Sequence, residues 1–164
     1  MKKNEMSAFQ NESIRVIAPS IFPNSTWNDA EVLGAMIWLW SKNTDYQRAA
    51  LDSALGVLLP IIKSKNFALV IRDNKPVGYM NWAYFNNEEE NLYLNQALDY
   101  VNFIECNHEN DQVKKLWILT FFCPFGLENV LLTKSIYKMV LKNQLCYYGY
   151  HKSKAKTIVK TIQC

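Results

Sequence analysis

The sequence predicts a single domain of the α+β class, with a mostly antiparallel central sheet flanked by helices. Two segments with helical periodicity come first, and short apolar runs typical of strands follow from residue 67 onward. The chain has 164 residues, of which 49% are hydrophobic, so it is long enough to bury one core.

Residues 1–25 are polar and irregular, and we interpret them as a flexible N-terminal arm that precedes one domain over residues 26–164. Residues 25–42 predict the first helix, because apolar side chains form a wide stripe there and acidic residues occupy the first turn. Thr26 or Asn28 can cap this helix.

Residues 48–64 predict a second helix, which we expect Pro60 to interrupt because proline lacks a backbone N–H. The periodicity then changes from helical to extended. Residues 67–73 and 77–85 predict two strands that form an antiparallel hairpin around the turn "DNKP".

The second half of the chain alternates helices and strands. An acidic start and an amphipathic pattern predict one helix over residues 87–104, followed by a polar loop. The remaining predicted elements are a strand at 115–122, a helix at 129–143 and two final strands at 145–151 and 156–163.

Composition and missing motifs narrow the possible functions. A net charge of +3 is only mildly basic, and no nucleic-acid signature accompanies it. The start of the chain has no apolar signal region and no apolar run of 18 residues exists, so we expect a cytoplasmic protein without a membrane span. The four cysteines form no CxxC pair, so we expect free thiols and no metal site.

Several collinear motifs resemble those of the RTX toxin-activating acyltransferases. The stretches are "VLGAMIWLWSKN", "LLPIIKSKNFALVIRDNKPVGYMNWAYFNNEEENLYL" and "LWILTFFCPFG". The matching residues are Gly34, Trp38, Leu39, Trp40, Leu59, Pro60, Pro76, Val77, Trp82, Ala83, Glu88, Trp117, Pro124, Phe125 and Gly126.

This resemblance implies a fold like that of the GNAT acyltransferases. It also implies transfer of a fatty acyl group from acyl carrier protein to an internal lysine of a protoxin, in the cytoplasm and without a bound cofactor. Acyl carrier protein and a protoxin are therefore the expected partners, and a homodimer or a hetero-complex is a further expectation.

The resemblance also suggests where substrates bind. Trp82 and Ala83 would end one strand, and the turn at residues 123–126 would end another, so that both line an acyl cleft between splayed strands. Proline removes a ladder donor, so strand pairing should stop at that turn. The predicted substrate-binding residues are Arg48, Trp40, Asn81, Trp82, Ala83, Cys123, Pro124, Phe125 and Gly126.

The catalytic pair of the resembled family is a histidine and an aspartate, and this chain departs from it. Tyr46 stands at the histidine position beside Asp45, and Thr120 stands at the aspartate position. Tyrosine has an ordinary pKa of about 10, so it is a poor base at neutral pH, whereas Asp45 could serve as one. Cys123 is either an acyl acceptor near the thioester or a small buried thiol.

Three other interpretations remain open. The chain could be a relative that attaches a siderophore-type group to a peptide bacteriocin of the microcin class, together with a partner protein. It could instead be a non-catalytic scaffold that keeps the fold, or an unrelated α+β module.

Overall fold

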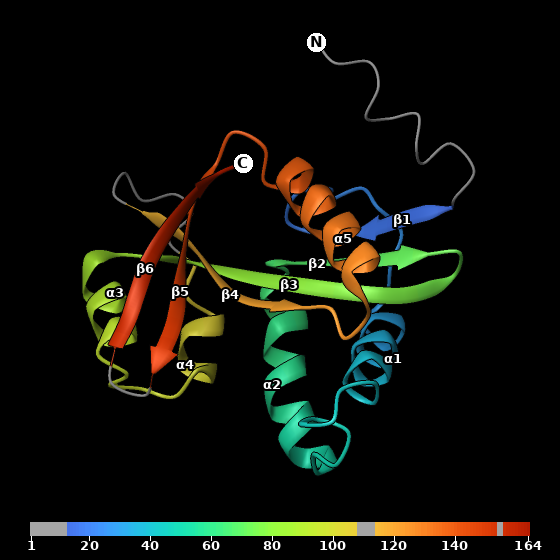
Figure 1. Ribbon diagram of the computed structural model, residues 1–164, viewed down its shortest axis with the longest axis horizontal. Coiled ribbons are helices and arrows are strands. Elements are labelled where there is room, and N and C mark those ends of the chain that lie inside the picture. Colours follow the sequence, from blue (N-terminus) through green and yellow to red (C-terminus); the bar gives the residue numbers. More distant parts are fainter. Residues whose placement is uncertain (1–12, 108–113, 154–155) are drawn as a thin grey trace.

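The computed structural model describes residues 13–107, 114–153 and 156–164. One six-stranded sheet with strand order β1-β2-β3-β4-β5-β6 forms its centre (Figure 1). The elements are β1 (Ile14–Ile17), α1 (Asp29–Trp40), α2 (Leu51–Ser64), β2 (Phe67–Arg72), β3 (Lys75–Phe85), α3 (Asn87–Leu94), α4 (Val101–Ile104), β4 (Lys115–Phe122), α5 (Leu127–Val140), β5 (Leu145–Ser153) and β6 (Lys156–Gln163).

Every neighbouring strand pair is antiparallel except β4 and β5, which are parallel and joined through α5. The predicted α+β class and the mostly antiparallel sheet are therefore confirmed. The β2–β3 hairpin is also confirmed, and its turn is tight because Asp73 and Asn74 both adopt positive φ angles of 49° and 62°.

Helices cover both faces of the sheet. Helices α1 and α2 lie on one face and α5 on the other (Figure 1). Leu39, Leu58 and Tyr79 belong to the core on the α1–α2 face, whereas Met80 and Ile136 belong to the core on the α5 face. Consecutive residues of β3 thus point to opposite faces, as in any pleated strand.

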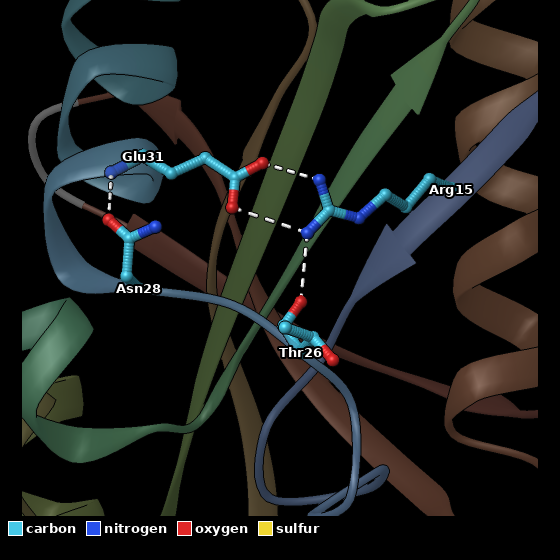
Figure 2. A network of polar contacts seen from close by, with 4 residues as sticks. All are labelled: Arg15, Thr26, Asn28 and Glu31. Atoms are coloured by element: carbon cyan, nitrogen blue, oxygen red, sulfur yellow. Dashed lines mark hydrogen bonds and ion pairs between the residues drawn. The ribbon is translucent and has the colours of Figure 1, made fainter.

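The segment after residue 13 is not the loose arm that the sequence predicts. Strand β1 pairs with β2, and Ile17 is buried with 1% of its surface exposed. Figure 2 shows the side chain of Arg15 paired with Glu31 of α1, and the Nη2 of Arg15 donates to the carbonyl of Thr26 at 2.8 Å. Tertiary contacts therefore fix a segment whose composition alone looks irregular, and residues 1–12 lie outside the described part.

Asn28 caps helix α1, as one of the two expected caps, and its Oδ1 accepts a hydrogen bond from the backbone N–H of Glu31 at 2.9 Å (Figure 2). Helix α2 does not stop at Pro60 but continues to Ser64. The predicted interruption of this helix was wrong, because Ile61 and Ile62, which follow the proline, are buried in the core. Their packing holds the last turn despite the missing backbone bond.

The predicted helix at 87–104 consists of two helices, α3 and α4. Gln96 has a positive φ of 52°, and its N–H bonds to the carbonyl of Tyr93 at 3.1 Å. The N–H of Ala97 bonds to the carbonyl of Leu92 at 3.0 Å, which completes a Schellman motif and ends α3. The predicted loop that follows falls mostly on residues 108–113, outside the described residues. No helix in the described part of the chain is long and apolar enough to cross a bilayer.

Candidate functional site

The parallel strands β4 and β5 separate from each other partway along their length. They pair only through Leu116 with Cys146, Trp117 with Tyr147 and Ile118 with Tyr148. At the same point β4 carries a bulge, since Asn81 of β3 faces Thr120 whereas Trp82 faces Ile118. Leu119 is the extra residue, and a bulge bends a strand away from its neighbour.

A cleft of about 480 Å³ lies at this divergence, and we refer to it as the β4–β5 cleft. It is mostly apolar and includes side chains from β3, β4, α5, β5 and β6. Leu119, Tyr148 and Ile162 contribute apolar lining, and Lys134 and Lys138 of α5 contribute two cations. The volume lies within the range of about 300–1,000 Å³ that is typical of small-ligand sites.

Tyr137 also lines this cleft, and 4% of its surface is exposed. Its hydroxyl is buried and has no hydrogen-bond partner in the described structure. Burial raises the pKa of Tyr137 well above its usual value, with smaller contributions from Cys123 and Tyr79. The hydroxyl therefore stays protonated at neutral pH.

On the opposite face of the sheet, the same part of β3 and β4 carries a group of polar and aromatic side chains. Tyr79 faces Phe122 across the strands, and Asn81 faces Thr120. The Tyr100 hydroxyl lies 2.7 Å from the Thr120 Oγ1 and donates to the Asn81 Oδ1 at 3.0 Å. We call Asn81, Tyr100 and Thr120 the polar triad.

The triad leaves one donor unused. Asn81 is fully buried, and its Nδ2 has no hydrogen-bond partner among the described residues. Burial raises the pKa of Tyr100 to about 12, although its hydrogen bonds to Thr120 and Asn81 oppose the shift. At neutral pH the triad is therefore uncharged and can donate hydrogen bonds, but its tyrosine does not act as a base.

Tyr46 and Trp40 lie beside the triad. The Tyr46 ring is 4.8 Å from Trp40 and 5.5 Å from Phe122, between ring centroids. The Trp40 Nε1 donates to the Tyr79 hydroxyl at 2.9 Å. Burial raises the pKa of Tyr79, and the nearby Tyr100 and Tyr46 add to the shift. Tyr46 itself is 43% exposed, so its side chain reaches both this aromatic group and solvent.

The structure thus brings Tyr46, Trp40, Asn81 and Thr120 into one region, although no hydrogen bond directly links Tyr46 to the triad in the described contacts. Asp45 and Arg48 are exposed in the same loop as Tyr46. The backbone N–H of Asp45 donates to the Asn43 Oδ1 at 2.8 Å, which helps to order the loop.

The turn Cys123-Pro124-Phe125-Gly126 connects β4 to α5, and β4 ends at Phe122 as the proline predicts. Phe125 packs on Trp38 at 5.8 Å, and Gly126 is the N-cap of α5. Cys123 is half-buried, with its sulfur 3.9 Å from the Thr133 Oγ1. The residues that line the β4–β5 cleft in the described structure do not include this turn.

Trp82 and Ala83 do not end a strand, which corrects the sequence-based expectation. Strand β3 continues to Phe85, and β2 and β4 flank it on either side. Both side chains are fully buried, Trp82 in the core on the α5 face and Ala83 beside Trp117. They stabilise the centre of the sheet and do not line the cleft among the described residues.

Sequence reasoning missed Tyr79, Tyr100 and Tyr137, as well as the two cleft lysines. Tyr79 and Asn81 are two residues apart in a predicted strand, and this spacing places them on one face. Tyr100 carried no such signal, because it precedes α4 and reaches the sheet only through the tertiary fold.

Comparison with known proteins identifies the relatives of this chain. The model of the RTX toxin acyltransferase family matches residues 25–163. The protein-lysine myristoyltransferase RtxC of Kingella kingae is 30% identical over 107 residues, which is 65% of this chain and 60% of RtxC. The protein-lysine myristoyltransferase HlyC of Escherichia coli is 32% identical over 99 residues, which is 60% of this chain and 55% of HlyC.

The RTX-II toxin-activating lysine-acyltransferase ApxIIC of Actinobacillus pleuropneumoniae is 26% identical over 104 residues, or 63% of this chain and 62% of ApxIIC. The matched region thus spans 55–62% of the length of these three relatives. The family model, in contrast, covers nearly all of the described structure, including the polar triad and all of the cleft lining except Cys164. The chain therefore belongs to the RTX toxin acyltransferase family.

Proposed function

We propose that this protein transfers a fatty acyl group from the thioester of acyl carrier protein to a lysine amine of a bacterial toxin precursor in the cytoplasm. Family membership supports the reaction class. The single observation that carries the proposal is the apolar β4–β5 cleft at the point where these parallel strands diverge. The polar triad lies on the opposite face of the sheet, and Leu119, which lines the cleft and also packs against the core of the α1–α2 face, lies between the two.

The strand arrangement supports a GNAT-like acyltransferase fold. In such folds an acyl-pantetheine thioester lies between two diverging parallel strands and bonds to exposed strand backbone. Here β4 and β5 are parallel, share only three residue pairs and diverge at the Leu119 bulge. Backbone groups of β4 beyond Ile118 therefore have no partner in β5 and are available to a ligand.

The side chains that line the β4–β5 cleft suit the acyl thioester of an acyl carrier protein. An acyl chain would lie against apolar lining such as Leu119 and Ile162, where burial contributes about 0.8 kcal/mol for each methylene group. Lys134 and Lys138 are exposed at the same cleft, and their charges suit the phosphate of a pantetheine arm.

The transfer requires one new bond and one broken bond. The lysine nitrogen attacks the thioester carbonyl, the C–N bond forms, the C–S bond breaks, and the amine proton ends on the carrier thiol. The lysine must first lose the proton of its ammonium form, and the exposed carboxylate of Asp45 is our proposed acceptor. Tyr46, beside Asp45, is our proposed relay, which gives its hydroxyl proton to the departing thiolate and takes the amine proton in return.

The unused donor of Asn81 supplies a further group. Its Nδ2 is buried without a partner beside the Thr120 and Tyr100 hydroxyls. A negative charge develops on the carbonyl oxygen during attack, and donors that are already oriented stabilise such a charge. We assign the triad this role for a thioester carbonyl that lies between the diverging strands β4 and β5, with Thr120 and Tyr100 orienting the Asn81 amide.

Intact-mass spectrometry tests the proposal. The full chain would be incubated with acyl carrier proteins that bear fatty acyl groups and with peptides that contain lysine. We expect the carrier to lose its acyl group and the peptide to gain it, and Asp45→Asn and Tyr46→Phe to slow transfer. Asp52→Asn, a change of the same chemistry at an exposed site in α2, is the control. Unchanged transfer in both loop variants would refute these residue roles.

The replacement of the family's histidine and aspartate by Tyr46 and Thr120 favours a second candidate. The chain could modify a microcin-type peptide with a siderophore-type group together with a partner protein, or it could serve as a scaffold. No discharge from any fatty acyl carrier, combined with a normally folded chain, would favour these alternatives.

A further inference from the structure

Two cysteines meet at the end of the sheet next to the cleft. Cys146 lies in β5 and is fully buried, whereas Cys164 directly follows β6 and is half-buried. Their sulfur atoms are 3.7 Å apart; Cys146 belongs to the core on the α5 face, and Cys164 packs against it. A backbone hydrogen bond fixes the position of Cys164, because its N–H donates to the carbonyl of Gln144 at 3.1 Å.

We propose that Cys146 and Cys164 form a thiol-oxidation site at which a hydroperoxide produces a reversible disulfide across β5 and β6. In the first step the Cys164 sulfur attacks the peroxide, the O–O bond breaks, and a sulfenic acid and water (or an alcohol) result. In the second step the Cys146 sulfur attacks that sulfenic sulfur, the S–S bond forms and a second water leaves. The two thiols are oxidised and the hydroperoxide is reduced.

The two thiols differ in burial, and this difference indicates which sulfur reacts with the peroxide and which attacks the sulfenic acid. Cys164 is the more accessible sulfur, so the oxidant meets it first. Burial raises the pKa of Cys146 to about 12, and the neighbouring Cys164 adds to the shift.

The geometry favours this pair over the other cysteines. Cys146 faces Ile162 across the strands, so Cys164 is its diagonal neighbour on the same face. The sulfurs must approach from 3.7 Å to about 2.05 Å, which a side-chain rotation and a small backbone shift at the end of β6 can provide. Cys106 and Cys123 instead have described polar contacts with the Asn102 carbonyl and the Thr133 hydroxyl.

Oxidation would change the β4–β5 cleft, because Cys164 and Ile162 line it. A bridge would draw the Cys164 side chain toward buried Cys146 and fix one wall of the cleft. This consequence rests on the proposed function, and we expect the oxidised chain to discharge an acyl carrier several-fold more slowly until a reductant restores the thiols.

Mass spectrometry of the full chain tests the inference without any acyl donor. Treatment with hydrogen peroxide should remove the mass of two hydrogen atoms, and digestion should yield one bridged peptide pair that contains Cys146 and Cys164. Cys146→Ala should abolish the bridge and leave oxygen added at Cys164. Cys106→Ser and Cys123→Ser are matched controls in which the bridge should persist.

A bridge that involves Cys106 or Cys123, a bridge only between two chains, or oxygen addition without any bridge would each overturn the inference. Circular dichroism of the Cys146→Ala protein would confirm that the variant is folded. Bridge formation on oxidation, together with no acyl transfer by the reduced chain, would refute the proposed function but not the thiol site. Normal acyl transfer by a chain that forms no bridge on oxidation would refute the thiol site but not the proposed function.

Discussion

Replacement of Gly78 by alanine should destabilise the protein, because β3, the end of β4 and α5 meet at this residue. A Cβ atom at position 78 would lie 2.8 Å from the backbone oxygen of Phe122, 3.2 Å from the Cβ of Cys123 and 3.3 Å from the Cγ2 of Thr133. Real Cβ atoms essentially never approach another atom within 3.0 Å, so the backbone of β4 must move.

The size of the effect follows from these contacts. Overpacking a tight core typically costs about 1–3 kcal/mol, and a fixed backbone oxygen leaves little room to relax. For a chain of 164 residues, each kcal/mol lowers the Tm by about 2–4 °C. We therefore expect Gly78→Ala to lower the Tm by roughly 2–12 °C, measured by circular dichroism.

Gly34→Ala is the matched control, since a Cβ there meets nothing within 4 Å and the residue is exposed in α1. Alanine is favoured over glycine within a helix by about 0.5–1 kcal/mol, so this variant should be as stable as the original chain or more so. If Gly78→Ala melts at or above the temperature of the original chain, the close approach of β3, β4 and α5 is wrong.

Three further changes test other parts of the structure. Trp40→Phe removes the donor to the buried Tyr79 hydroxyl and should cost about 1–3 kcal/mol in urea unfolding, whereas Trp38→Phe, at a partly exposed site, should cost less. Asn86→Ala removes the capping box of α3 and should cost about 1 kcal/mol in the same assay; no change would show that α3 does not depend on its cap. The contribution of Tyr100 to the free energy of unfolding should be level up to pH 10 and fall between pH 10 and 12, because Tyr100 has a raised pKa of about 12 and binds its proton more tightly when folded. Tyr100→Phe should make that fall shallower, and an equally steep fall would contradict the shift.

Much of the fold followed from local patterns. Three features depend on residues close together in sequence: the cap at Asn28, the hairpin around Asp73 and Asn74, and the end of β4 before Pro124. Local rules failed at Pro60 and at residues 14–17, since buried side chains hold both segments in place against their own propensity.

The sequence by itself determined the α+β class, the family and the positions of Tyr46 and Thr120. Only the tertiary structure decided that Tyr100 completes a triad with Asn81, that Trp82 is a core residue, and that a cleft opens at Leu119. The physical reason is that strand register, a bulge and the end of pairing between β4 and β5 arise from contacts between distant segments, which no local pattern encodes.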